Sequence, residues 1–409
     1  MSAPPQPLLV ATDWGGAGAV PLGTLLAAAS IVAFFYRRAL QRAQPLRLEL
    51  VLLLSVAGLA IAWFAPVLFS SDVYAYAAYG EMTRIGLDPY ARAPLDTSDV
   101  VVRAAQWQWV SAFPICVYGP AFLGLARSIV TVFAPFGVLA QLDAFRAIAC
   151  AAFLLCVMLA CDVYRGDRAT RWRAAATIGL NPVAIWCAAE GHNDALALAV
   201  VLAGFALVRR RVVGVGAAVA ALSALVKPPG AAAAIALAVV NRRARIGAAA
   251  GIAIAAACSI PLFHGIASQL APHGRYAPQA SLQAVLAPLG PILAFALAAT
   301  AALALATLGV ASLRRGLDEG WIWLGLGAWV LVPNPYPWYA LWLIALAAMA
   351  PRTRVASVAI FLSFTSLLRY VPDAIGTPSP PLAVALGIAA TLPLLGLLPL
   401  RAWYNERLA

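Results

Sequence analysis

Apolar residues recur along this chain in long runs, separated by short polar segments that are rich in arginine. A run of about 20 apolar residues is long enough to cross the hydrocarbon core of a bilayer as a helix. This pattern predicts an all-α protein, a polytopic transmembrane bundle of about 13 helices. The runs lie near residues 17–36, 49–69, 142–161, 174–189, 194–208, 212–227, 229–241, 246–263, 290–312, 321–333, 338–350, 355–370 and 381–400.

Composition supports a membrane protein. The 409 residues are 63% hydrophobic and 11% charged, with a mean hydropathy of +0.87. A soluble domain needs about 25% charged residues to cover its surface. Residues 1–409 are therefore expected to form a single membrane domain surrounded by lipid.

The net charge of +12 does not indicate a nucleic-acid-binding protein. The basic residues form short clusters between apolar runs, and such clusters remain in the cytoplasm and orient membrane helices. This rule places the N-terminus outside, the C-terminus inside, and external loops at about 70–141 and 264–289. The clusters are Arg37/Arg38/Arg42/Arg47, Arg165/Arg168/Arg171/Arg173, Arg209–Arg211, Arg242/Arg243/Arg245, Arg314/Arg315, Arg352/Arg354 and Arg401/Arg407.

Residues 119–137 are apolar enough to resemble another transmembrane helix. If they crossed the membrane, the cluster at 165–173 would lie outside. Arg127 and Pro135 also interrupt the run. The segment is therefore expected to be an amphipathic helix that lies on the outer leaflet or dips into it.

Several later helices are shorter than the roughly 20 residues that span a bilayer. They meet at Asn181-Pro182, at Gly191 and at Pro228-Pro229. Irregular backbone is tolerated at membrane depth only where it is buried in protein or lines a water-filled cavity. These positions therefore predict broken helices around a cavity.

Asp72 lies where the second apolar run meets the first external loop. A half-buried carboxylate there could act as a general base on an aqueous substrate, or it could cap the helix that follows. Polar and aromatic residues of the same loop are candidates for substrate binding, although an interfacial aromatic belt would have the same composition. They are Tyr74, Tyr76, Glu81 and Tyr118.

A second polar group, Glu190, His192, Asn193 and Asp194, interrupts two apolar helices on the same side as Asp72. Ionisable residues at that depth indicate function. Asp194 could instead cap the next helix, and His192 could be a turn residue. Asp72, His192 and Asp194 match no known ligand spacing, so no metal is expected.

Lys227 is the only lysine in a chain that otherwise uses arginine. It ends a helix of small residues, and Pro228-Pro229 must break that helix. An ammonium group in such apolar surroundings needs an anion, either a carboxylate or a phosphate. Alternatively, the side chain extends to the membrane interface.

Two further segments carry candidate binding residues. The second external loop offers phosphate-binding and hydroxyl-binding side chains: His264, Arg275 and Tyr276. A proline-rich aromatic turn near the C-terminus suits a sugar ring or an isoprenoid tail, although an aromatic belt would also explain it. Its candidates are Asn334, Tyr336, Trp338 and Tyr339.

In order and placement, these motifs resemble the C superfamily of glycosyltransferases (GT-C). The segments SSDVYAYAAYGEMTRIGLDPY, YGP, NPVAIWCAAEGHNDALAL and ALVKPPG look like those of the polyprenol-phosphate-mannose-dependent α-1,6-mannosyltransferases of bacterial envelopes. The resemblance covers residues 49–345. It implies a catalytic module at 17–263, with first external loop 70–141, and C-terminal helices at 264–409 that complete the donor and acceptor cavity.

The resemblance also implies roles. Asp72 would be the general base of an inverting transfer from a polyprenyl-phosphate sugar, with mannose the nearest likeness, to a glycan or glycolipid acceptor. Asp194 with His192 would orient a substrate, and Lys227, Arg275 and His264 would hold the phosphate. No cofactor is implied. The active site would face the periplasm or cell exterior from the bacterial inner membrane.

Two alternatives come from other classes. A secondary transporter or flippase would place its ionisable residues near the bilayer midplane, often within an inverted repeat. Here these residues gather at the outer edge, and no repeat is evident in the sequence. A non-catalytic assembly subunit would leave Asp72 and Lys227 without a role.

Overall fold

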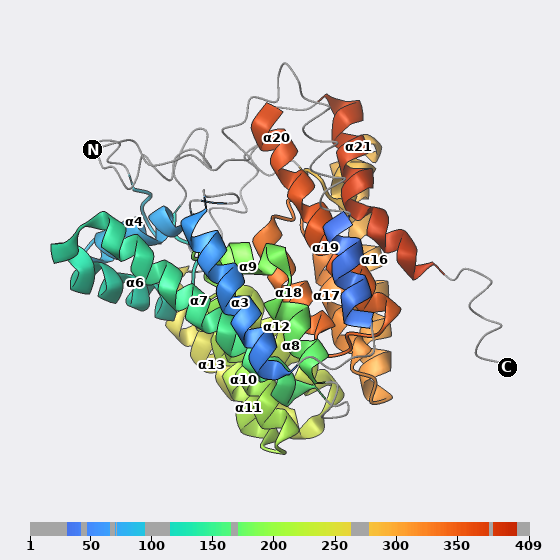
Figure 1. The fold of residues 1–409 in the computed structure, drawn as a ribbon, viewed down its shortest axis with the longest axis horizontal. Helices are drawn as coiled ribbons and strands as arrows, with labels where there is room; N and C mark the ends of the chain where they lie inside the picture. Colours follow the sequence, from blue (N-terminus) through green and yellow to red (C-terminus); the bar gives the residue numbers. More distant parts are fainter. Residues whose placement is uncertain are drawn as a thin grey trace. The chain divides into compact units, whose positions relative to one another are not determined.

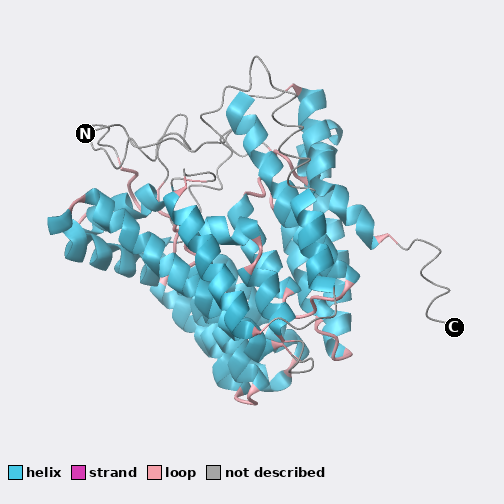
Figure 2. Ribbon diagram, in the orientation of Figure 1, coloured by secondary structure: helices cyan, strands magenta, loops and turns pink. Residues whose placement is uncertain are grey.

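The computed structural model describes residues 31–41, 47–65, 70, 72–94, 115–164, 171–262, 278–375 and 379–398. Within these ranges every regular element is a helix, and no strand occurs (Figure 2). The all-α prediction is confirmed for this part of the chain.

The chain divides into two compact units, which are described separately. The N-terminal unit comprises residues 1–12 and 44–274, and the C-terminal unit comprises residues 13–43 and 275–409. The helical residues 31–41 therefore group with the C-terminal unit, and the division into a catalytic module and C-terminal helices stays a prediction.

The helices of the N-terminal unit follow the apolar runs closely (Figure 1). The expected surface helix at 119–137 is α6, whose buried side chains lie on one face, as an amphipathic helix requires. The elements are α3 (Leu48–Phe64), α4 (Asp72–Arg84), α6 (Pro120–Phe133), η2 (Ala134–Phe136), α7 (Val138–Val163), α8 (Trp172–Gly179), α9 (Pro182–Ala189), α10 (Asp194–Arg209), α11 (Val213–Leu222), η4 (Ser223–Leu225), η5 (Pro228–Gly230), α12 (Ala231–Val240), η6 (Arg242–Ala244) and α13 (Arg245–Cys258).

All three predicted helix breaks are present. Asn181 has an extended backbone and begins α9, so the run at 174–189 forms two short helices, α8 and α9. Gly191 has a φ of +93°, which favours glycine, in the turn before α10. Lys227 is extended (φ −145°, ψ 120°) directly before the 3₁₀ turn η5.

Small residues let the helices of this unit approach closely. A Cβ atom on Gly204 of α10 would lie 2.5 Å from the backbone oxygen of Gly216 on α11. Gly80 of α4 packs in the same way against α6, where a Cβ would lie 2.6 Å from the oxygen of Ala126. Glycine contacts of this kind are typical of packed membrane helices.

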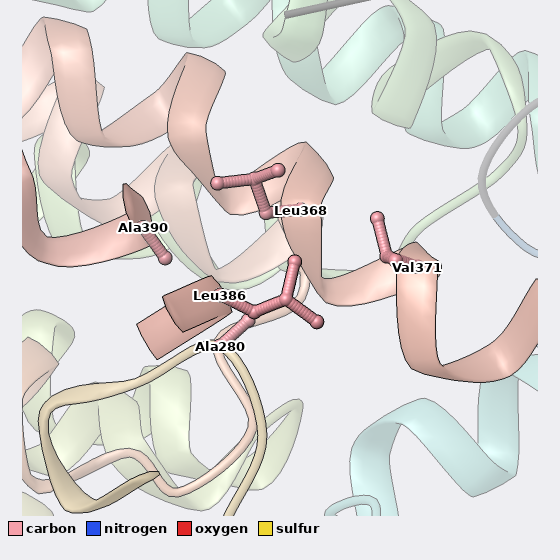
Figure 3. Packing of buried hydrophobic residues seen from close by; sticks show 5 residues of the cluster. All are labelled: Ala280, Leu368, Val371, Leu386 and Ala390. Atoms are coloured by element: carbon pink, nitrogen blue, oxygen red, sulfur yellow. The ribbon is translucent and has the colours of Figure 1, made fainter. Parts of the chain in front are cut away.

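The C-terminal unit holds its first helical segment through Arg37, whose Nη1 donates to the oxygen of Pro351 at 2.6 Å. A buried apolar cluster joins η10, α20 and α21 through Leu368, Val371, Leu386 and Ala390, with Ala280, which precedes α15, beside them (Figure 3). The elements are α15 (Leu282–Leu286), η8 (Ala287–Leu289), α16 (Pro291–Arg314), α17 (Glu319–Leu331), η9 (Pro337–Tyr339), α18 (Ala340–Ala347), α19 (Arg354–Thr365), η10 (Ser366–Arg369), α20 (Tyr370–Ile375), α21 (Pro380–Thr391) and η11 (Leu392–Leu397).

Four helical stretches are long and apolar enough to cross a membrane, and the bent pair α9 and α10 would be a fifth. The other apolar helices of the described residues are shorter, so the count of about 13 crossings stays a prediction. The four stretches are Val138–Val163, Pro291–Arg314, Arg354–Pro372 and Pro380–Leu397.

Candidate functional site

The two acidic motifs meet at the start of α4. The hydroxyl of Ser70 accepts a hydrogen bond from the backbone N–H of Asp72 (3.0 Å). The backbone N–H of Ser70 donates to Oε2 of Glu190 (3.1 Å). Ser70, Asp72 and Glu190 are all buried. Two segments that are 120 residues apart in the sequence are thus joined at the predicted general base.

His192 faces Asp72 across this junction. Nδ1 of His192 lies 3.7 Å from Oδ2 of Asp72, and the two side chains are 1% and 9% exposed. The left-handed turn at Gly191 precedes His192, and a Cβ there would lie 3.2 Å from the side chain of Val73. The turn therefore packs directly on the first residues of α4.

Lys227 pairs with Asp194. Its Nζ lies 2.6 Å from Oδ2 of Asp194, whose side chain is fully shielded from solvent, while the Lys227 side chain is 13% exposed. Helices α10 and α11 run out from Asp194 and back toward Lys227, which brings the two residues together. Of the two anions that the sequence left open, the structure supplies the carboxylate. We refer to Asp72, His192, Asp194 and Lys227 as the carboxylate–lysine cluster.

Tyr76 lies beside this cluster and is 1% exposed. Its ring makes edge contacts with Tyr118 (5.1 Å between centroids) and Phe122 (4.9 Å). Burial raises the pKa of Tyr76 well above its ordinary value, and the negative charges of Asp72 and Asp194 raise it further. Tyr76 is therefore a neutral phenol next to two carboxylates.

Gly119 anchors the first loop to the segment that carries Lys227. Its backbone N–H donates to the oxygen of Val226 (2.9 Å). A Cβ on Gly119 would collide with the backbone carbonyl of Leu225. The Tyr-Gly-Pro motif thus contacts the main chain immediately before Lys227. This role was missed by the sequence interpretation, although a glycine between tyrosine and proline is its visible signal.

The sequence interpretation also did not identify Arg146 of α7 as a residue of this region. Its Nε donates to the oxygen of Ala189 (2.7 Å), and its Nη2 donates to the oxygen of Trp63 (2.8 Å). The guanidinium group lies 4.1 Å from the centroid of the Trp63 ring. Arg146 therefore ties the C-terminal ends of α3 and α9 together beside the turn that holds Glu190.

Two other candidates of the first loop, Glu81 and Tyr74, form none of the contacts described above. Glu81 forms an exposed ion pair with Arg84 (2.6 Å), and this partner lowers the pKa of Glu81. Nine positions along α4 separate it from Asp72, about 14 Å at 1.5 Å per residue. Tyr74 is buried, and burial raises its pKa. His264, Arg275 and Tyr276 lie outside the described residues.

The aromatic turn at 334–339 belongs to the C-terminal unit. The rings of Tyr336 and Trp338 are stacked, with centroids 4.4 Å apart and an angle of 6° between planes. The guanidinium of Arg369 lies 4.2 Å from the Tyr336 centroid and donates to the Tyr336 hydroxyl (2.6 Å). The ring of Tyr336 is thus in contact with two protein groups, Trp338 and Arg369. Asn334 and Tyr339 flank this stack in the sequence.

Within the described ranges, no three His, Cys, Asp or Glu side chains are grouped so that they could hold a metal ion. The expectation that neither a metal nor a cofactor takes part stays a prediction. The charged groups that converge are two carboxylates, an imidazole and an ammonium group, which suit proton transfer and anion binding.

Comparison with known proteins identifies the family. The family model described as alpha-(1->6)-mannopyranosyltransferase, N-terminal domain, matches residues 9–245, more than half of the chain. The chain belongs to this mannosyltransferase family. The resemblance inferred from the sequence is thus confirmed at the level of the family, and the matched region contains the whole carboxylate–lysine cluster.

Two relatives show similarity over short stretches. Alpha-(1->6)-mannopyranosyltransferase A of Mycobacterium tuberculosis is 35% identical over 78 residues, which cover 18% of this chain and 14% of the relative. Alpha-(1->6)-mannopyranosyltransferase B of Corynebacterium glutamicum is 38% identical over 77 residues, 17% of this chain and 12% of the relative. No solved structure matches the chain. Membership of this family together with the apolar helices supports a membrane mannosyltransferase.

Proposed function

We propose that this protein is an inverting glycosyltransferase of the GT-C type. It transfers mannose from a polyprenyl-phosphate donor to a glycan or glycolipid acceptor of the cell envelope, outside the bacterial inner membrane. One observation carries the proposal: Asp72, His192, Asp194 and Lys227 converge from three separate segments of the N-terminal unit. The family match makes a transporter or a flippase a weaker explanation for these buried charges.

In the proposed reaction, Asp72 is the general base. Its carboxylate accepts the proton of the acceptor hydroxyl while the acceptor oxygen forms a bond to the anomeric carbon. The bond from that carbon to the donor phosphate oxygen breaks, and polyprenyl phosphate leaves with the electron pair. Attack from the face opposite the phosphate inverts the configuration. His192, 3.7 Å from Asp72, orients the carboxylate.

Lys227 would stabilise the leaving group. The phosphate gains negative charge as the glycosidic bond breaks, so a cation placed in advance favours the transition state over the ground state. The contact with Asp194 holds the ammonium group in place before the donor arrives. An arriving phosphate would share this ammonium group with Asp194.

The test of this proposal is a transfer assay with the purified full-length protein and a panel of polyprenyl-phosphate sugars. Asp72→Asn keeps the shape of the side chain but removes the base. We expect transfer from polyprenyl-phosphate mannose to fall roughly a hundredfold to ten-thousandfold, the usual contribution of general acid–base catalysis.

Asp162→Asn is the matched control, because Asp162 is 44% exposed and pairs with Arg210 at the opposite end of α10. This variant should keep normal activity. Unfolding temperatures of both variants, measured in the same detergent, separate lost chemistry from lost folding. Full activity in Asp72→Asn would exclude the assigned base.

A further inference from the structure

Asn193 occupies the N-cap position of α10 but does not cap it. Its side chain forms no hydrogen bond with the first turn of the helix. The residue is only 2% exposed, and neither Nδ2 nor Oδ1 has a hydrogen-bond partner in the structure described here. Burying an amide group without partners is unfavourable, so such a group calls for an explanation.

Asn181 provides a comparison within the same unit. It occupies the N-cap position of α9 and is fully buried, and its side-chain oxygen accepts the N–H of Ala184 at 3.1 Å. Its backbone is extended, as capping requires. Asn193 instead has a helical backbone (φ −69°, ψ −8°). Two asparagines thus occupy the N-cap positions of successive helices, but only the side chain of Asn181 forms the capping hydrogen bond.

The position of Asn193 places its amide group at the carboxylate–lysine cluster. The preceding residue, His192, lies 3.7 Å from Asp72, and the following residue, Asp194, lies 2.6 Å from Lys227. The backbone of Asn193 also forms a hydrogen bond with Tyr76. Asn193 therefore lies in the sequence between the residue that faces the predicted base and the residue that pairs with the predicted phosphate-binding cation, and its backbone contacts a tyrosine beside both.

The chemistry of an amide group limits what it can bind. Nδ2 is a donor and Oδ1 is an acceptor, so a ligand must offer both functions to satisfy both atoms. An ionised phosphate offers only acceptors, and an isoprenoid chain offers neither. Neighbouring hydroxyl groups of a sugar ring offer donors and acceptors together.

We propose that Asn193 binds hydroxyl groups of a sugar ring and selects the sugar at this site. This inference rests on the proposed mannosyltransferase function and deepens it. The sugar can be the mannose of the donor or the terminal residue of the acceptor, and both supply the same chemistry. Because the amide group forms no hydrogen bond with the first turn of α10, its removal should change sugar recognition without weakening the helix.

The test compares Asn193→Ala with Asn181→Ala in the full-length protein. For Asn193→Ala we expect kcat/KM to fall about tenfold to a hundredfold, the effect of losing hydrogen bonds between buried polar groups and a substrate. Measuring kcat/KM separately for donor and acceptor shows which of the two sugars Asn193 binds. The unfolding temperature should stay the same or rise. Asn181→Ala should lower the unfolding temperature but keep both KM values.

Deoxy sugars give a second readout that a structural role would not produce. Removing the recognised hydroxyl from the donor or acceptor should slow the native enzyme by a similar factor and should change Asn193→Ala little. An unchanged kcat/KM for both substrates in Asn193→Ala would overturn the inference. The inference would also be overturned if Asn193→Ala were less stable than the native protein and lost as much activity with every deoxy sugar as the native protein does.

Failure of the proposed function has a different signature. If the native protein transfers sugar from no polyprenyl-phosphate donor, that proposal fails, and the inference is judged by sugar binding alone. Free mannose and methyl mannoside at millimolar concentrations are then the probes in a thermal-shift measurement. A stabilisation of the native protein that Asn193→Ala lacks supports the inference, and no stabilisation of the native protein overturns it.

Discussion

The ammonium group of Lys227 and the carboxylate of Asp194 lie 2.6 Å apart in a region almost closed to solvent. Removing one member of a buried ion pair leaves an uncompensated charge, which costs about 3–5 kcal/mol. Replacing both members with neutral groups of similar size is far less harmful. The pair therefore contributes to the stability of the N-terminal unit, and in the proposed function it also determines the charge that a donor phosphate meets.

We predict that Asp194→Asn and Lys227→Met each lower the free energy of unfolding by about 3–5 kcal/mol. The double variant should regain most of this stability. Lys227→Met should also weaken donor binding more than acceptor binding, because only the donor carries the phosphate. Denaturant unfolding and separate KM measurements test both statements. Equal effects on donor and acceptor would contradict the phosphate role.

Cys116 gives a prediction about reactivity. Burial raises its pKa to about 12, so the thiol stays protonated at neutral and mildly alkaline pH. Because the thiolate is the reactive form, alkylation should be slow. We expect iodoacetamide at pH 8 to leave Cys116 unmodified in the folded protein and to modify it after unfolding in SDS. Peptide mass spectrometry measures both states, and rapid labelling of the folded protein would show that the thiol is accessible.

At the scale of helices, the hydrophobic runs predicted most of the observed helix bounds. A helix that is buried in protein or lipid needs apolar residues along its length, so its position can be seen directly in the sequence. The expected run at 142–161 is α7 (Val138–Val163), and the run at 290–312 is α16 (Pro291–Arg314). The helix breaks were also predicted, since proline and glycine mark them locally.

The long-range contacts could not be predicted in the same way. Gly119 meets Val226 through main-chain atoms, and Arg146 reaches two carbonyl groups from distant helices. No local pattern encodes such partners. The sequence placed Asp72, Asp194 and Lys227 on one side of the membrane, but it did not show that Asp194 would be the partner of Lys227. The aromatic turn at 334–339 was expected to suit a sugar ring or an isoprenoid tail, and the structure packs Trp338 and Arg369 against the ring of Tyr336.

Two glycines near the first loop make a matched test at this scale. Gly119→Ala would place a Cβ against the backbone of Leu225, whereas nothing lies within 4 Å of a Cβ on Gly124 in α6. We expect Gly119→Ala to lower the free energy of unfolding by about 1–3 kcal/mol and to reduce transfer by displacing Lys227. Gly124→Ala should be neutral or stabilise by about 0.5–1 kcal/mol. Identical behaviour of the two variants would show that the contact at Gly119 has no consequence.

For the whole molecule, the arginine clusters predict which ends of the helices face the cytoplasm. Arg209 ends α10 and Arg242 begins η6, both at the far ends of helices from Asp194 and Lys227. Positive charge and the carboxylate–lysine cluster therefore lie at opposite ends of this part of the N-terminal unit. The predicted orientation puts the cluster outside.

Cysteine labelling tests this orientation. In a variant without the six native cysteines, we would introduce either Leu87→Cys, which follows α4, or Leu317→Cys, which lies between α16 and α17; both leucines are exposed. A membrane-impermeant maleimide should label the first in intact cells and the second only after permeabilisation. The reverse pattern would contradict the predicted topology.

The contact between Gly119 and the segment before Lys227 is made by backbone atoms alone. A main-chain contact does not depend on the identity of the neighbouring side chains. It should therefore tolerate substitutions around Gly119, provided that the glycine itself is retained. A chimera that exchanges the first loop between related enzymes should therefore retain its docking when the graft includes this glycine. In this chain, changes elsewhere in the first loop would therefore leave the main chain before Lys227 in place.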